Sequence, residues 1–147
     1  MIVPTEELPR LAGAVTLVDG GFDPIHPGHI AYLAASAALG LPVLCNISPD
    51  DWVGRKHAPL LDQDARAAVL DAIRYVDYTH LSTSTTAAVL ALLRPRYYAK
   101  GADWKDRLPA EELAACAEHG IETVFLDTVL DSSTAILRRY EAGTRNA

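Results

Sequence analysis

Short apolar runs alternate along this chain with longer segments in which apolar residues recur at helical spacing. The short runs predict five strands, at residues 14–18, 41–47, 76–81, 96–99 and 121–126, and the first of them is rich in β-branched residues. The segments between and after them predict helices at residues 27–39, 62–75, 87–93, 110–119 and 132–140. The polar stretch 48–59 predicts a loop, and the hydroxyl residues 82–86 predict the cap of the helix that follows them.

This alternation of strands and helices is typical of βαβ crossovers, which produce a parallel sheet. We therefore predict an α/β fold, a single Rossmann-like domain with a five-stranded parallel sheet and helices on both faces. The 147 residues fit one domain spanning 1–147, with a tail expected to be disordered after about residue 143. Ligands of such sheets bind beyond the carboxyl ends of the strands, where the strand order reverses.

Composition narrows the classes of function. The formal net charge of −6 argues against general binding to nucleic acid, which needs basic surfaces. Cys45 and Cys116 stand in no metal-binding or redox spacing and indicate buried thiols in a reducing compartment. The first residues lack the pattern of a signal peptide, and no apolar stretch approaches the ~20 residues that span a bilayer. The sequence predicts a cytoplasmic protein that does not bind membranes.

The segment Asp19-Gly-Gly-Phe-Asp-Pro-Ile-His-Pro-Gly-His29 connects the first predicted strand to the first predicted helix. Free backbone N–H groups and the helix dipole at such a junction favour an anion. Gly20 and Gly21 permit close approach of a triphosphate, and Gly28 removes a side chain between His26 and His29. The two imidazoles face the same side of the helix start and provide N–H donors for phosphate oxygens. The alternatives are a zinc site, which lacks an obvious third ligand, and two histidines without a role.

The pattern Gly20-x-Phe-Asp-x-x-His-x-Gly-His29 resembles the signature of the cytidylyltransferase-like nucleotidyltransferase superfamily. That group includes glycerol-3-phosphate cytidylyltransferases and heptose-1-phosphate adenylyltransferases. The resemblance implies catalytic roles for His26 and His29, which stabilise the reacting α-phosphate. It also implies a nucleotide-binding segment that consists of Gly20, Gly21, Phe22, Asp23, His26, Gly28 and His29.

Further segments extend the resemblance over nearly the whole chain. Ser132, Ser133 and Thr134 resemble a second signature that opens the last helix, where hydroxyls and amides bind phosphates; an ordinary helix cap is the alternative. The segment Lys100-Gly-Ala-Asp-Trp104 resembles a nucleotide- and acceptor-binding segment, in which Lys100 and Asp103 bind the nucleotide. The family has a phosphate-binding lysine in the loop after the second strand, and this position corresponds to Lys56 or to its neighbour Arg55. We expect Lys56 to be catalytic and Arg55 to bind the nucleotide. The acceptor-binding residues implied by the resemblance are Arg66, Arg74, Trp104 and Arg138.

These residues predict a nucleotidyltransferase that transfers a nucleoside monophosphate to a small phosphorylated acceptor and releases pyrophosphate. The segment at Lys100 favours ATP and a sugar 1-phosphate, whereas the segment at Arg74 is typical of enzymes that use CTP and a polyol phosphate. Mg²⁺ is expected to arrive with the nucleotide, without direct protein ligands, although Asp23 is a candidate. The resemblance implies a homodimer.

Three other functions remain as alternatives at this point. A nucleotide-binding regulatory module would bind the nucleotide without releasing pyrophosphate. A nicotinamide-dependent dehydrogenase would require Gly-x-Gly-x-x-Gly after the first strand, where this chain has Gly-Gly-Phe-Asp. A zinc hydrolase would contain zinc bound to the histidines.

Overall fold

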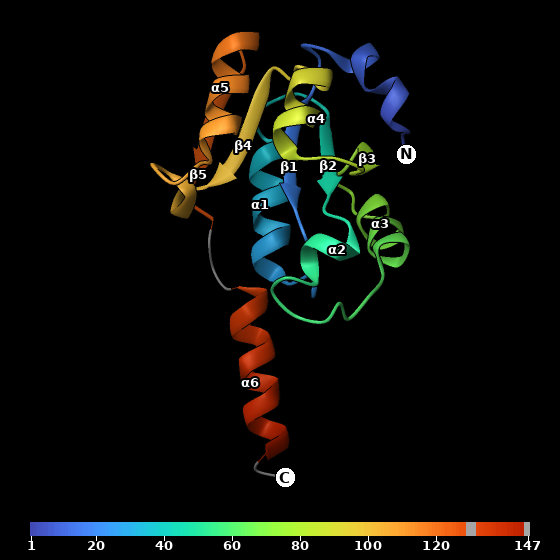
Figure 1. Ribbon diagram of the computed structural model, residues 1–147, viewed down its shortest axis with the longest axis vertical. Coiled ribbons are helices and arrows are strands. Elements are labelled where there is room, and N and C mark those ends of the chain that lie inside the picture. Colours follow the sequence, from blue (N-terminus) through green and yellow to red (C-terminus); the bar gives the residue numbers. More distant parts are fainter. Residues whose placement is uncertain (129–131, 146–147) are drawn as a thin grey trace.

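The computed structural model describes residues 1–128 and 132–145, which form a parallel sheet covered by helices (Figure 1). The strands are β1 (Thr16–Gly20), β2 (Val43–Ile47), β3 (Tyr78–Leu81), β4 (Tyr97–Gly101) and β5 (Glu122–Leu126). Their order across the five-stranded sheet is β3-β2-β1-β4-β5, and every neighbouring pair is parallel. The predicted α/β class and parallel sheet are confirmed. The strand order reverses at β1: β2 and β3 are added on one side of β1, and β4 and β5 are added on its other side.

The helices are α1 (Pro27–Ala37), α2 (Asp50–Val53), α3 (Gln63–Asp71), α4 (Thr86–Leu93), α5 (Ala110–His119) and α6 (Ser133–Arg145). Two short 3-10 helices, η1 (Thr5–Leu11) and η2 (Ala102–Trp104), complete the described elements. Neither α2 nor η1 was predicted: α2 is a single turn without an apolar repeat, and η1 contains Pro9, which disfavours an α-helix. α3 ends at Asp71, earlier than expected.

Alternation along the strands divides the core into two layers. Leu17, Leu44 and Tyr98 pack with α4, α5 and η1 on one face of the sheet. Val18 and Ala99, their neighbours in sequence, pack with α1 and α3 on the other face. Because successive side chains of a strand point to opposite faces, the central strands bury apolar side chains on both faces of the sheet. The polar ends of β1, β2 and β4 are thereby left at one edge.

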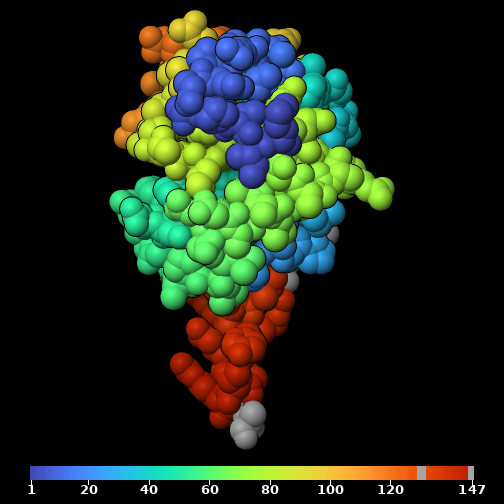
Figure 2. All heavy atoms as spheres, turned by 90° about the vertical axis from the view of Figure 1, so that its right-hand side faces the viewer, coloured from blue at the N-terminus to red at the C-terminus, as the bar shows by residue number. Residues whose placement is uncertain are grey.

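α6 projects from this edge, away from the rest of the domain (Figures 1 and 2). None of its residues is buried, and Tyr140 is 69% exposed. The helix passes the predicted end at residue 140 and also passes Gly143, after which we expected a disordered tail; residues 146–147 lie outside the described part. Its start is held by Ser133, whose hydroxyl donates to the carbonyl of Pro24 at 2.9 Å. In the described part of the chain, no helix has the length and apolar character needed to cross a bilayer.

Candidate active site

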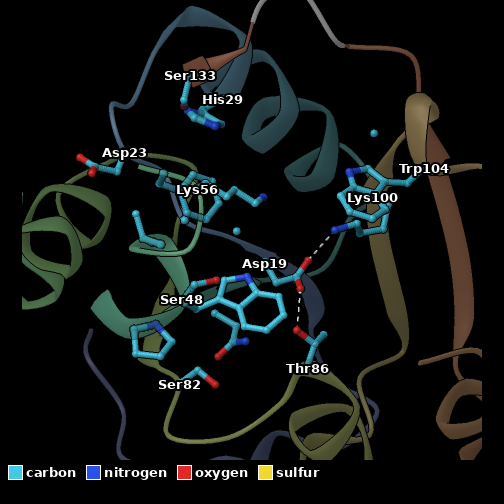
Figure 3. Close-up of a pocket in the computed structure, with 18 of the residues that line it drawn as sticks. Asp19, Asp23, His29, Ser48, Lys56, Ser82, Thr86, Lys100, Trp104 and Ser133 are labelled. Carbon is cyan, nitrogen blue, oxygen red and sulfur yellow. Dashed lines mark hydrogen bonds and ion pairs between the residues drawn. The ribbon is translucent and has the colours of Figure 1, made fainter. Parts of the chain in front are cut away.

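A cavity of about 970 Å³ opens at the carboxyl ends of β1, β2 and β4, where the strand order reverses. This volume lies at the upper end of the ~300–1,000 Å³ typical of ligand pockets. Figure 3 shows His29 and Ser133 at one end of this cavity, with Asp19 between a side formed by Ser48 and Ser82 and a side formed by Lys100 and Trp104. The predicted site residues that line it are Gly20, Gly21, Phe22, Asp23, His26, Gly28, His29, Arg55, Lys56, Lys100, Asp103, Trp104, Ser132, Ser133 and Thr134.

His26 and His29 form the start of α1 and bind each other's backbone. The Nδ1 atom of His26, the N-cap, accepts from the Gly28 amide at 3.0 Å, and the His26 amide donates to His29 Nδ1 at 3.3 Å. This reciprocal pattern is a capping box. Because both Nδ1 atoms are acceptors, each neutral ring has its proton on Nε2. The ring centroids lie 3.8 Å apart. The local fold therefore fixes both tautomers.

The pKa of His29 is lowered from 6.5 to about 4, first by burial and then by repulsion from His26. We expect the His29 ring in the free protein to titrate near pH 4, measured by NMR of its ring protons. A phosphate beside the ring should raise this pKa because it stabilises the imidazolium.

Since the unfolded chain takes up this proton at a higher pH than the folded one, the free energy of unfolding should fall as pH falls from 6.5 toward 4. A His29 midpoint near 6.5 would contradict this placement.

Side chains at Gly20 or Gly21 would crowd their neighbours in the loop between β1 and α1. A Cβ atom on Gly20 would lie 3.3 Å from the Phe22 ring, and one on Gly21 would lie 3.2 Å from the Val53 side chain. Phe22 adopts a φ of 53°, and its ring centroid lies 5.0 Å from that of His29. The two glycines thus make room for Phe22 and α2 as well as for a ligand.

Asp23 binds the backbone of a second loop, which precedes α3. Its two carboxylate oxygens accept from the amides of Leu60 and Leu61 at 2.7 and 3.2 Å, and only 2% of the residue is exposed. We expected Asp23 to bind the nucleotide or its metal. Its contacts instead join the first loop of the site to residues 60–61.

Arg66 was expected to bind the acceptor, but its side chain is buried and bonded to the protein itself. Its guanidinium donates to the carbonyls of Leu61, Gly21 and Ser48 and to the Asp50 carboxylate, with distances of 2.7–3.1 Å. The residue is 1% exposed and does not line the cavity. A guanidinium with five N–H donors satisfies several carbonyls at once, so Arg66 holds three loops around the site.

Arg74 and Arg138 also lie away from the cavity lining. Arg74 is exposed in the turn between α3 and β3, at the amino ends of the strands and therefore at the opposite edge of the sheet. Arg138 is exposed on α6 beyond the first turn of that helix. Neither placement supports the expected contact with an acceptor in this cavity.

Arg55 and Lys56 both line the cavity, but their surroundings differ. The Arg55 guanidinium carbon lies 4.6 Å from the ring centroid of Trp52, a cation–π contact. Lys56 forms no ion pair within residues 1–128 and 132–145, and Figure 3 shows it on the His29 side of the cavity. This difference favours Lys56 as the phosphate-binding cation.

Asp19, at the end of β1, connects the two sides of the cavity. It accepts from Lys100 Nζ and the Thr86 hydroxyl, both at 2.9 Å, and lies 3.3 Å from the Tyr98 hydroxyl. Lys100 Nζ also lies 4.3 Å from the ring centroid of Trp104. The charge of Lys100, a predicted nucleotide ligand, is therefore already paired. Tyr98 donates to Glu112 at 2.5 Å, and burial raises the pKa of Glu112.

Sequence reasoning missed several cavity residues, namely Asp19, Asn46, Ser48, Trp52, Ser82, Thr86 and Glu112. Asp19 and Asn46 stand at the carboxyl ends of predicted strands, and this position could have identified them as site residues. Trp52 lies in a segment predicted as a loop, where nothing indicated its direction. The described residues contain no group of three or more His, Cys, Asp or Glu side chains arranged to hold a metal.

Comparisons with known proteins agree with this geometry. The family model described as cytidylyltransferase-like matches residues 17–139. The bifunctional protein HldE of Gluconobacter oxydans is 32% identical over 150 residues, which cover 94% of this chain and 31% of that protein. The HldE protein of Azorhizobium caulinodans is 36% identical over 129 residues, which cover 84% of this chain and 26% of that protein. The chain thus spans less than a third of the length of these two relatives.

Two solved structures share the fold. The lipopolysaccharide core biosynthesis protein from Thermoplasma volcanium has a TM-score of 0.67 and 24% identity, covering 78% of this chain and 96% of that chain. Pantothenate synthetase from Thermus thermophilus has a TM-score of 0.59 and 16% identity, covering 85% of this chain and 60% of that chain. Together with the family model, which spans both the histidine motif and the start of α6, these findings show that the chain belongs to the cytidylyltransferase-like nucleotidyltransferase superfamily.

Proposed function

We propose that this protein transfers AMP from ATP to the phosphate of a sugar 1-phosphate and releases pyrophosphate. The observation that carries the proposal is the pair of imidazoles at the start of α1, whose Nδ1 atoms are bound by backbone amides and whose Nε2 atoms bear the protons. The similarity to HldE proteins, together with the resemblance of Lys100-Gly-Ala-Asp103 to heptose-1-phosphate adenylyltransferases, supports ATP and a sugar phosphate. The Thermoplasma neighbour, a lipopolysaccharide core biosynthesis protein, also supports a sugar acceptor.

The reaction is an in-line displacement. A phosphate oxygen of the acceptor forms a bond to the α-phosphorus of ATP, and the bond from that phosphorus to the α–β bridging oxygen breaks. A phosphate monoester is already anionic near neutral pH, so the protein needs no strong general base. His26, His29 and Lys56 stabilise the charge that develops on the α-phosphate, and positioning supplies most of the remaining rate. Pyrophosphate leaves toward Ser132, Ser133 and Thr134 at the start of α6.

Mg²⁺ enters with the nucleotide in this proposal, because this ion keeps much of its water and binds phosphate oxygens readily. Asp23 lines the cavity, but its oxygens accept two backbone amides, so it fits a role in orienting water around the ion better than direct ligation. We also propose a homodimer, as the family resemblance implies. The exposed α6, with Tyr140 and no buried residue, supports a contact with a second subunit.

Pyrophosphate release separates this proposal from its rivals. We expect release with ATP and a cyclic sugar 1-phosphate, and much less with CTP and glycerol 3-phosphate, measured by a coupled pyrophosphatase assay. Preference for CTP with glycerol 3-phosphate would favour a cytidylyltransferase instead. Nucleotide binding without release from any pair of substrates would favour a regulatory module and contradict the proposed enzyme.

A further inference from the structure

We propose that Trp52 is the acceptor platform of this site, on which the ring of a cyclic sugar phosphate stacks while Asn46 and Ser48 bind its hydroxyls. This inference rests on the proposed function and assigns one substrate to each side of the cavity. Trp52, Asn46 and Ser48 lie on the side formed by β2 and α2. Lys100 and Trp104 lie on the side formed by β4 and η2.

Trp52 is suited to stacking by its exposure and by its neighbour. The residue is 51% exposed although it lines the cavity, so much of its indole is accessible to a ligand. Arg55, which also lines the cavity, covers one face of the ring at 4.6 Å from the centroid, so a ligand would stack on the other face. The backbone beside it is fixed, because Asp50, at the start of α2, binds the buried Arg66. Trp52 is thus an accessible aromatic surface on a well-supported turn.

Asn46 provides a directed hydrogen-bond donor next to this surface. Its amide oxygen lies 2.7 Å from His80 Nδ1, and His80 Nε2 lies 2.9 Å from the Thr5 hydroxyl. Because the amide oxygen of Asn46 can only accept, His80 Nδ1 donates to it. Burial lowers the pKa of His80 and so favours the neutral ring, in which Nε2 accepts from Thr5. With its oxygen used in this way, Asn46 has its NH₂ group left to donate, and the residue lines the cavity although only 3% of it is exposed. An oriented amide suits the hydroxyl oxygens of a sugar.

The opposite side of the cavity suits a planar base. There Lys100 Nζ lies 4.3 Å from the ring centroid of Trp104, and its charge is paired with Asp19 at 2.9 Å. In Figure 3, Ser48 and Ser82 lie on one side of Asp19 and Trp104 on the other, with His29 at the end that both sides share. Two substrates that approach the histidines from the two sides bring their phosphates together there. An acyclic glycerol chain would offer no ring face to Trp52.

Steady-state kinetics tests the assignment through the Michaelis constants of the two substrates. We expect Trp52→Leu to raise KM for α-D-mannose 1-phosphate or α-D-glucose 1-phosphate about tenfold, and to change KM for ATP less than twofold. Trp52→Phe should restore most of the loss, because it retains an aromatic face. Tyr97→Leu is the matched control: Arg96 lies 5.2 Å from the Tyr97 ring centroid, but Tyr97 does not line the cavity. A KM effect of Trp52→Leu on ATP alone would overturn the assignment.

Fluorescence tests the same inference without turnover, since the chain has two tryptophans and one lies on each side. With excitation selective for tryptophan over the tyrosines, the emission comes from Trp52 in Trp104→Phe and from Trp104 in Trp52→Phe. We expect the emission of Trp52 to change with either cyclic sugar phosphate and that of Trp104 to change with a non-hydrolysable ATP analogue. If Trp52 responds to the ATP analogue or glycerol 3-phosphate but to neither sugar phosphate, or to none of them, the inference fails. Because this readout needs no pyrophosphate release, it separates failure of the platform from failure of the proposed enzyme.

Discussion

Replacing His29 with alanine is expected to lower kcat for pyrophosphate release by about a hundredfold or more, while the domain remains folded. The substitution removes a preorganised Nε2–H donor from the site at which charge accumulates on the α-phosphate. It also removes the Nδ1 acceptor of the His26 amide, so part of the effect could reflect a weakened start of α1. Initial rates with saturating ATP and sugar phosphate, together with circular dichroism, measure both consequences.

His29→Gln separates the two contributions. Glutamine at the third position of a helix accepts the amide of the capping residue, so the cap is retained while the imidazole donor is lost. We expect a loss of kcat close to that of His29→Ala with a smaller loss of stability. His119→Ala, at the end of α5 and outside the cavity lining, is the control and should leave kcat unchanged. Activity near the wild-type level in either His29 variant would refute the assigned role.

Replacing Arg66 with methionine is expected to lower the free energy of unfolding by about 3–5 kcal/mol. Methionine fills similar space but leaves the carbonyls of Leu61, Gly21 and Ser48 without their donor and Asp50 without its partner. Activity should fall as well, because these carbonyls belong to the loops that line the cavity. Urea unfolding followed by circular dichroism gives the stability, at a pH where both proteins are folded without urea.

Two further substitutions test whether the geometry of Arg66 or only its charge matters. Arg66→Lys retains the charge, but an ammonium group lacks the planar fork that reaches acceptors in several directions, so we expect it to recover only part of the stability. Arg74→Met removes an exposed arginine from the turn that follows α3 and should change stability by no more than about 0.5 kcal/mol. Equal urea midpoints for Arg66→Met and Arg74→Met would show that the buried network contributes little.

The parts of the fold and site that could be predicted from the sequence are those that depend on local pattern. Apolar runs and helical spacing identified every strand of the sheet and the five longer α-helices, and the segment from Gly20 to His29 placed the histidines at the start of α1. Such features follow from neighbouring residues alone: a run of branched apolar residues forms a buried strand, and glycine and proline mark its junction with a helix.

The features that the sequence did not predict depend on contacts between residues far apart in the chain. Arginine next to a predicted site suggests a ligand contact, yet Arg66 is enclosed by carbonyls from residues 18 and 45 positions away, and no local pattern shows this. Trp52 was missed because its single-turn helix is formed by tertiary contacts and has no apolar repeat that the sequence could show. Asp19 contacts Thr86 and Lys100, which lie 67 and 81 positions further along the chain. Lys100 becomes its neighbour only when β4 pairs with β1.

The position of β1 at the middle of the sheet has an evolutionary consequence. Residues that contact one side of the cavity follow β2 and β3, those that contact the other side follow β4, and the histidine loop follows β1 between them. Under the proposed assignment, substitutions after β4 act on the nucleotide, whereas those after β2 act on the acceptor and also reach Lys56. We therefore expect relatives with different acceptors to differ mainly on the β2 side and to share the residues after β4.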